Sequence, residues 1–397
     1  MNADTPPIAS APSPLSELFL VFLKLGALSM GGPAAHLALM EREFVQNRGW
    51  VSRQDFLDTI GAMNLIPGPV SVEVALNIGW RRRGLAGLLA AGAGFCLPAI
   101  VLTLLLAWLY VHFGQAPQLN HIMTGVQGVV LALIAVACWH LAKIAARSWF
   151  LVALGVGAFA MNLAGLNEIA VLVLAGGIGI LFGRTTAAAG SKTAALVVGL
   201  AALPSAALAA AAGAGVKLAT ISLASLGLGF LAVGCMLYGS GYVLIAFLDD
   251  WLIHETGLMT ATQLADAIAV GNITPGPVTS AATFIGYSLH GMPGAAVATL
   301  GMFLPAFVLV QVLSPWLPRL RRYPWTARFL DAVNVASVAL ICAVLLRLGM
   351  AVATNWLAPT MFLVTLVVAL KRWCDPLWLI PVAAGAGWLA GWLGWIA

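Results

Sequence analysis

The sequence predicts an all-α polytopic membrane protein built from two inverted-topology repeats. Hydrophobic residues make up 61% of the chain and charged residues only 8%, which lies far outside the range of soluble globular domains. Apolar runs of roughly 20 residues, enough to cross a bilayer core of about 30 Å, recur between short polar loops. The stretch NLIPGPV at 64–70 returns as NITPGPV at 272–278, so the chain carries the same double-proline break twice.

We divide the chain into four parts. Residues 1–16 have no Lys or Arg and no apolar core, which predicts a disordered tail rather than a cleaved signal peptide. Residues 17–186 and 217–397 are predicted to form the N-terminal and C-terminal repeats, with the Ala/Gly-rich segment 187–216 connecting them. Inverted repeats require an odd number of crossings between them, so either this connector or a short neighbouring helix does not cross fully. We expect about 10–12 membrane helices in all.

The repeat is visible residue by residue. Residues 22–70 align with 230–278 without a gap, and after a one-residue deletion the alignment continues to Ala99, which pairs with Ala306. Glycines and prolines recur in register: Gly31, Gly49, Gly84, Gly87 and Pro98 return as Gly239, Gly257, Gly291, Gly294 and Pro305. After these repeated stretches, helices are expected near 118–145, 149–164 and 168–184, and again near 326–350, 356–370 and 376–396.

Positive charge predicts how the repeats are oriented. Arg81, Arg82 and Arg83 precede the long apolar helix at 85–111, and the loop after that helix has no Lys or Arg. In the second repeat the loop before the equivalent helix is uncharged, and the arginines follow it, at Arg319, Arg321, Arg322 and Arg328. Positive loops face the cytoplasm, so the two helices run in opposite directions. The repeats are therefore predicted to be inverted, with their breaks facing each other near the bilayer midplane.

Each break lies inside a predicted re-entrant hairpin. Ser52 and Thr260 have the spacing of helix-opening caps. A helix of about 14 residues, or roughly 21 Å, follows each cap and is ended by the first proline of a PGP motif, so it is too short to span. The glycine allows a sharp turn, and the second proline suits the first position of another short helix. The two PGP motifs are Pro67-Gly68-Pro69 and Pro275-Gly276-Pro277.

The helix that begins after each PGP motif predicts an anion site. Its N-terminus presents free N–H groups and a partial positive charge. Irregular backbone at membrane depth is tolerated where it lines a polar cavity, so two facing breaks favour a shared oxyanion site over simple packing kinks. The candidate substrate-binding residues are the two PGP motifs with Asn64, Val70, Ser71, Asn272, Thr274, Val278, Thr279 and Ser280.

Ionisable residues near the motifs each have two interpretations. Glu73 is either a proton-linked carboxylate, which we favour, or an acid that stabilises the first turn of its helix. Lys24 either faces the anion path or snorkels to the interface. Asp58 and Asp266 are explained better by the helix dipole than by a proton relay. His36 alone is more often structural than functional.

Other classes of site find no support. The five cysteines lie far apart with no CxxC motif, which indicates small core hydrophobes, and the histidines show no HExxH motif. We therefore expect no metal, no cofactor and no catalytic residues. The formal charge of +5 comes from loop residues and suits anionic lipid, with no indication of nucleic-acid binding.

The stretches FLKLGALSMGGPAAHLAL, GWVSRQDFLDTIGAMNLIPGPVSVEVALNIG and YGSGYVLIAFL resemble the paired signatures of the chromate ion transporter family in its long two-repeat form. The resemblance covers residues 19–113 and 229–318. It implies proton-driven efflux of chromate, a divalent tetrahedral oxyanion, across the inner membrane by an antiporter that gives chromate resistance. Further motif residues carried over by this resemblance are Gly31, Gly32, Pro33, His36, Gly239, Gly241, Tyr242, Thr283 and Gly286.

The sequence also departs from the family pattern. Met30 stands where many members have Phe, and Asn272 where many have Gln, and Val70 and Val72 replace residues that are often polar. These changes leave the anion open, so a carrier of sulfate or another oxyanion is the alternative, and a membrane-embedded enzyme is a third hypothesis with no nucleophile and base pair to support it. The expected partners are chromate or sulfate, protons and the lipid bilayer, and a homodimer stays open.

Overall fold

The computed structural model describes most of both repeats. The described residues are 14–30, 32–64, 66–113, 117–182, 221–238, 241–314, 324–353, 355–371, 373 and 378–395. Among them all regular structure is helical, which confirms the predicted all-α class. The connector 187–216 lies outside the described residues, as do Gly31, Gly239 and the arginines at 319, 321 and 322.

The longer helices recur in the same order in both repeats, and the second repeat adds short 3₁₀ helices. The first consists of α1 (Leu15–Leu28), α2 (Pro33–Glu41), the π-helix η1 (Arg42–Asn47), α3 (Arg53–Met63), α4 (Val70–Phe113), α5 (Pro117–Ala145), α6 (Trp149–Leu163) and α7 (Glu168–Phe182). The second consists of α9 (Leu223–Met236), η2 (Gly241–Val243), α10 (Leu244–Leu248), the π-helix η3 (Asp249–Glu255), α11 (Ala261–Ile273), η4 (Val278–Ser280), α12 (Ala281–Leu313), α14 (Pro324–Val352), α15 (Leu357–Lys371) and α16 (Leu379–Trp392). The order confirms the duplication.

Several helices suit a bilayer. In the described part of the chain, four stretches are long and apolar enough to span: α4, most of α5, η4 with α12, and most of α14. The shorter apolar helices are α6, α7, α9, α15 and α16. The helices from α5 to α7 and from α14 to α16 lie where the sequence predicts them, with bounds that differ by a few residues.

The predicted caps open the hairpin helices. The Ser52 hydroxyl accepts a hydrogen bond from the Asp55 N–H at 3.0 Å, at the start of α3. Thr260 and Gln263 form a complete capping box at the start of α11. Each helix ends shortly before a PGP motif, and another helix begins directly after that motif. The break therefore follows from the prolines, which remove donors and cannot continue a helix.

The long helices α4 and α12 are each two helices joined by a sharp bend. Gly84 has φ 56° and ψ −143°, and Gly291 at the equivalent place has φ 60° and ψ −147°. A Cβ on Gly79 would collide with the carbonyl oxygen of Gly87, so the two arms of α4 pack backbone to backbone. The pair Gly286 and Gly294 does the same in α12. Each PGP motif is therefore flanked by two short helices, as predicted.

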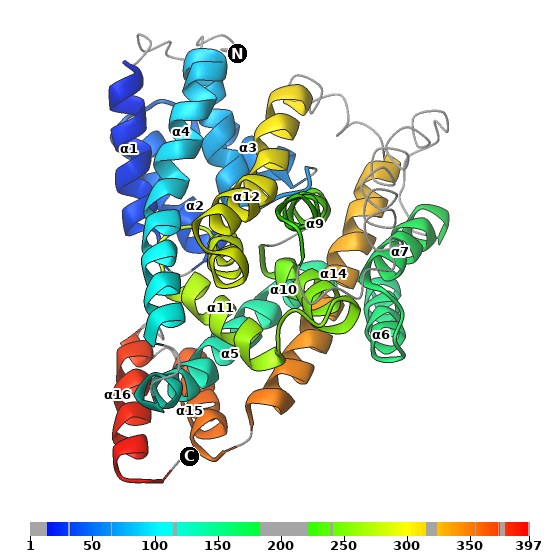
Figure 1. Cartoon of the computed structure of the whole chain (residues 1–397). Coiled ribbons are helices and arrows are strands. Elements are labelled where there is room, and N and C mark those ends of the chain that lie inside the picture. The colour runs from blue at the N-terminus through cyan, green and yellow to red at the C-terminus, as the bar shows by residue number, and fades with distance from the viewer. Residues whose placement is uncertain are drawn as a thin grey trace, which may run out of the picture.

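The repeats interlock about a pseudo-two-fold axis. α4 packs against α12 in the centre, with α1 beside α4 and α9 beside α12. α5 packs on α15 and α16, and α14 packs on α6 and α7. The last two helices of each repeat therefore pack against the other repeat (Figure 1). In Figure 1 α4 ends toward the bottom and α12 ends toward the top. Equivalent helices run in opposite directions, which agrees with the inverted arrangement.

One contact between the repeats was not expected from the sequence. The sulfur atoms of Cys138 on α5 and Cys342 on α14 lie 3.0 Å apart, and both thiols are free. Their separation in the chain carries no pairing signal, and only the crossing of α5 and α14 brings them together.

Candidate functional site

Each PGP motif donates a backbone hydrogen bond to the opposite repeat, and the two hydrogen bonds match. The Gly68 N–H donates to the Leu237 carbonyl at 2.8 Å, and the Gly276 N–H donates to the Ser29 carbonyl at 2.7 Å. Leu237 and Ser29 occupy equivalent positions, just after α9 and α1. A two-fold axis produces such a pair of hydrogen bonds, because each contact then recurs with the two repeats interchanged. The broken backbone of both repeats therefore meets at one place.

A small buried cavity lies between the motifs. Its lining residues are Pro33, His36, Pro69, Ser71, Gly241, Tyr242, Pro277, Val278 and Thr279. Its volume is about 10 Å³, close to that of one water-sized probe. Most of these residues come from segments that the sequence singled out, and they derive from both repeats. The structure thus gathers them on the axis, at the starts of α2, α4 and η4.

Buried donors surround this cavity. His36 Nδ1 lies 3.2 Å from Ser71 Oγ. When Ser71 donates this bond, the ring proton is on Nε2, which has no protein partner. The hydroxyl of Thr279, which is equivalent to Ser71, is fully buried and also has no partner. Buried polar groups are nearly always paired, so unpaired donors at this position favour a polar ligand there.

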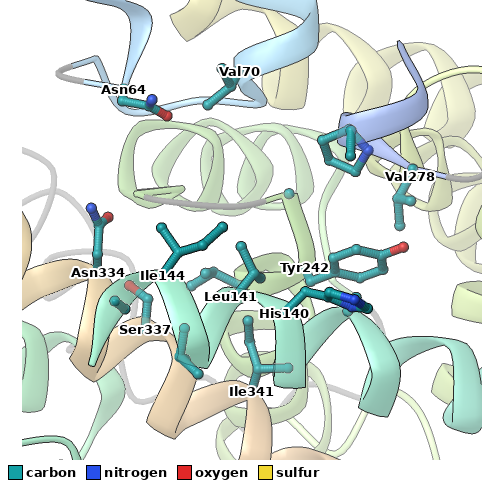
Figure 2. A pocket seen from close by; sticks show the side chains of 18 of the residues that line it. Asn64, Val70, His140, Leu141, Ile144, Tyr242, Val278, Asn334, Ser337 and Ile341 are labelled. Carbon is teal, nitrogen blue, oxygen red and sulfur yellow. The ribbon is translucent and has the colours of Figure 1, made fainter. Parts of the chain in front are cut away.

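A second, much larger cavity of about 1040 Å³ leads toward the motifs. It is lined by α5 from Leu133 to Ala145 and by Arg147 just after it, by α14 from Ala327 to Ile341, and by residues of both hairpins. In Figure 2 the labelled side chains of α5 and α14 lie across the cavity from Asn64 and Val70. The cavity follows the C-terminal half of α5 and the N-terminal half of α14, so it extends to the side on which Arg147 and Arg328 lie.

Tyr242 separates the two cavities. Its side chain lines both, together with Pro33, Gly241 and Val278. The Tyr242 hydroxyl donates to Asn272 Oδ1 at 3.3 Å, and a Cβ on Gly32 would lie 3.0 Å from the hydroxyl oxygen. The ring therefore lies where a solute would pass from the large cavity to the small one.

Glu73 is enclosed beside the first PGP motif. The side chain is fully buried in the first turn of α4, and neither carboxyl oxygen has a hydrogen-bond partner. A Cβ on Gly68 would lie 2.5 Å from Glu73 Oε1, so the carboxyl group rests against the motif itself. A buried carboxyl group without partners is costly, which favours a role in function over one in stability.

Not every predicted site residue lies at the small cavity. Thr274 and Ser280 face Thr103 instead, with oxygen atoms 3.2 Å from its hydroxyl. Thr283 is hydrogen-bonded to Thr299 at 2.8 Å, within the α12 hairpin. Lys24 is exposed on α1 and lines neither cavity. The large cavity is lined by several of the others, namely Gly32, Asn64, Val70, Asn272, Thr274 and Gly276.

Several polar residues that no sequence pattern singled out also lie near the two cavities. Ser29 is buried with an unpaired hydroxyl, and its carbonyl holds the second PGP motif. Asn334 and Ser337 line the large cavity with unpaired oxygen atoms. Thr103 lies in the second arm of α4, far along the chain from the first PGP motif. Ser29 lies two residues before the motif residues Gly31, Gly32 and Pro33, which is a usable signal, but the others depend on helix crossings that no local pattern encodes.

The donor set fits an oxyanion better than a cation. Hydroxyl groups, backbone N–H groups at helix starts and an imidazole N–H donate to oxygen atoms. Within the described ranges, no group of three His, Cys, Asp or Glu side chains is placed to hold a metal ion. The arrangement thus supports recognition and passage of an anion.

Comparison with known proteins agrees with this chemistry. The family profile described as "Chromate transporter" matches residues 16–180 and again 224–388, which are the two repeats. No solved structure matches the chain.

Curated relatives are similar over nearly the whole chain. The chromate transport protein of Cupriavidus metallidurans is 30% identical, with 97% of each chain covered. The probable chromate transport protein of Synechococcus elongatus is 30% identical, over 94% of this chain and 95% of the relative. The chromate transport protein of Pseudomonas aeruginosa is 32% identical, over 97% and 94%.

Proposed function

The chain belongs to the chromate transporter family, and we propose that it exports chromate across the inner membrane by secondary active transport coupled to the proton gradient. The observation that carries this proposal is the meeting of the two PGP motifs around buried, unpaired donors. The relatives whose names specify chromate transport support the choice of anion.

The site between the motifs is proposed to bind the anion. Two helix starts, the Ser71 and Thr279 hydroxyl groups and His36 converge there from both repeats. A tetrahedral dianion presents four oxygen atoms, and donors on two sides of the axis match that shape. The anion is larger than the present cavity of about 10 Å³, so binding requires Tyr242 and the adjoining loops to move.

Glu73 is proposed to link proton movement to anion movement. The carboxyl group rests on Gly68, so it shares the field of the site with an incoming dianion. The two negative groups repel each other in a poorly hydrated space, and anion binding then favours proton uptake by Glu73. Release of the anion favours proton loss. The proton then crosses with the anion in the same direction, and because the dianion with one proton keeps one net negative charge, an inside-negative membrane potential drives both outward.

Sulfate is the alternative substrate, because it is also a tetrahedral divalent oxyanion and the donors do not distinguish the central atom. The test measures uptake of labelled chromate and labelled sulfate into inverted membrane vesicles, with and without a proton gradient. We expect gradient-stimulated chromate uptake, which in inverted vesicles corresponds to export. Stimulated sulfate uptake with chromate only as a competitor would assign the chain to sulfate, and uptake indifferent to the gradient would exclude the proposed coupling.

A further inference from the structure

The hairpin helices α3 and α11 are equivalent in sequence but differ in their surroundings. α11 packs against α5, α12 and α14, and every residue from Leu264 to Gly271 is buried. α3 packs chiefly against α4, and its buried side chains are Phe56, Thr59 and Met63. One hairpin is therefore enclosed by the helices that line the large cavity, while the other is not.

A carboxylate contact closes the enclosed side. Asp266 on α11 is 4% exposed, and its Oδ2 accepts a hydrogen bond from the Tyr110 hydroxyl at 2.8 Å. Its Oδ1 accepts one from Gln127 Nε2 at 2.6 Å. Tyr110 and Gln127 belong to α4 and α5 of the first repeat, so this contact joins the two repeats. A buried carboxylate is tolerated only when it is hydrogen-bonded, which makes the contact specific. The helix-dipole interpretation of Asp266 is thus insufficient.

The equivalent residues on the other side have different surroundings. Asp58 on α3 pairs with Asp266 in the repeat alignment, and it is exposed, with Gln54 as a neighbour at 3.4 Å. α5 and α14 both have 29 residues and begin at a proline, so Gln127 corresponds to Asn334. Asn334 lines the large cavity, and its buried Oδ1 has no partner. A carboxylate and a carboxamide side chain meet on one side, whereas their counterparts on the other side lie on an exposed face of α3 and in the wall of the large cavity.

We infer that these are alternate latches: Gln127 and Tyr110 on Asp266 close one side of the pathway in this state, and Asn334 on Asp58 closes the other side in the opposite state. Inverted repeats exchange their conformations between the two states, so the contact that one repeat makes in one state is made by its counterpart in the other. In that opposite state α3 becomes enclosed and Asp266 is released. The inference rests on the proposed transport activity, but not on which anion is carried.

The two latches also differ in sequence. The position equivalent to Tyr110 is Leu317, which has no hydroxyl group and lies outside the described residues.

State-dependent labelling tests this assignment without any substrate. Ala137 lines the large cavity on α5, so in a chain whose five native cysteines are replaced by alanine, Ala137→Cys reports whether that cavity is open. The measurement is its rate of reaction with a membrane-impermeant maleimide in inverted vesicles. Gln127→Ala removes a hydrogen bond to a carboxylate only in the open-cavity state, so we expect the rate to fall by up to about tenfold.

Asn334→Ala is the matched control, because it acts on the opposite latch. It should leave the labelling rate high or raise it, and the double variant Gln127→Ala/Asn334→Ala should recover most of the rate that Gln127→Ala loses. Equal effects of the same sign, no effect of Gln127→Ala, or no recovery in the double variant would overturn the inference. If Gln127→Ala leaves no protein in the membrane, Tyr110→Phe removes one hydroxyl from the same latch and must lower the rate as well. Failure of chromate transport would not affect this readout.

Discussion

The two halves of the candidate site have matching backbone geometry but different side chains. Gly68 and Gly276 make matching hydrogen bonds at 2.8 and 2.7 Å, and both have positive φ, at 154° and 109°. The first half adds His36 and Glu73, whereas the equivalent positions of the second half are Leu244 and Ala281. Duplication thus preserved the glycines and prolines that shape the break, and the ionisable groups stand on one side only.

The second half contributes neutral hydroxyl groups. Thr279 replaces Ser71, and its hydroxyl faces the small cavity without a partner. Thr274 and Ser280 contact Thr103, which ties the second PGP motif to α4 of the first repeat. Under the proposed function, both halves donate hydrogen bonds to the anion, and the carboxyl group that takes up a proton lies in the first half only.

The largest effect is expected from substituting the two glycines that give both halves the same backbone turn. Valine at Gly68 or Gly276 must adopt a positive φ that β-branched residues avoid, and its Cβ would lie 2.5 Å from Glu73 Oε1 or 2.8 Å from Ala99 Cβ. We expect both Gly68→Val and Gly276→Val to lose transport completely. Vesicle uptake measures this, with the amount of protein in the membrane determined by immunoblot.

Gly257→Ala is the control for this pair. Gly257 also has positive φ, at 63°, but no atom lies within 4 Å of the position that a Cβ would occupy there. Its substitution adds backbone strain of about 1 kcal/mol without touching the site. Transport near the normal rate in either valine variant would show that the motif is only a packing kink.

The next largest effect concerns Glu73, which has no acidic counterpart in the second half. Glu73→Gln fixes the neutral state of the carboxyl group, so anion binding should be kept or tightened while stimulation by the proton gradient disappears. Binding, gradient-driven flux and gradient-free flux are measured side by side in vesicles. Asp55→Asn is the control, because Asp55 is a first-turn acid of α3 but is exposed. A Gln variant whose flux still follows the gradient would reduce Glu73 to a partner of its helix dipole, worth about 0.3–1 kcal/mol.

A smaller effect tests whether the second half binds the anion. Thr279→Val replaces a buried hydroxyl that has no partner, so the folded protein should keep its stability or gain about 1 kcal/mol. Loss of a donor to the anion should weaken binding by about fivefold. Thermal unfolding in detergent and anion binding report the two changes separately. Reduced stability with unchanged binding would make Thr279 a structural residue.

Local patterns sufficed to predict the helices and the breaks. Ser52 and Thr260 cap where their spacing predicts, and the PGP motifs end α3 and α11 because proline lacks an N–H whatever surrounds it. The bends at Gly84 and Gly291 also recur at matching positions, but in the sequence those glycines indicate only the repeat. Their role as hairpin turns requires the packing of Gly79 on Gly87, which no local rule describes.

The side chains of the site were harder to predict. Ser71, Thr279 and His36 reach the small cavity as expected of motif residues, but Thr274 and Ser280 turn toward Thr103. The direction in which a hydroxyl points depends on its helix phase and on the facing helix, and neither is fixed by proximity to a proline. Asp266 shows the same limit, because its partners come from α4 and α5 of the other repeat.

The smallest expected effect concerns Tyr242, which further distinguishes the halves, because its counterpart in the first repeat is Ala34. The Tyr242 ring is 7% exposed and lies between the two cavities, so most of its barrier to passage is steric. Tyr242→Phe keeps the ring and removes the 3.3 Å hydrogen bond to Asn272. A neutral bond of this kind is worth about 0.5–1.5 kcal/mol, so the rate of anion exchange between vesicle and medium should change by only a few fold, toward faster exchange. Tyr242→Ala removes the ring as well and should accelerate exchange more while weakening selection between chromate and sulfate. If Phe slows exchange instead, the hydroxyl contacts the passing anion directly, and the second half then supplies a donor at the entrance as well as at the axis.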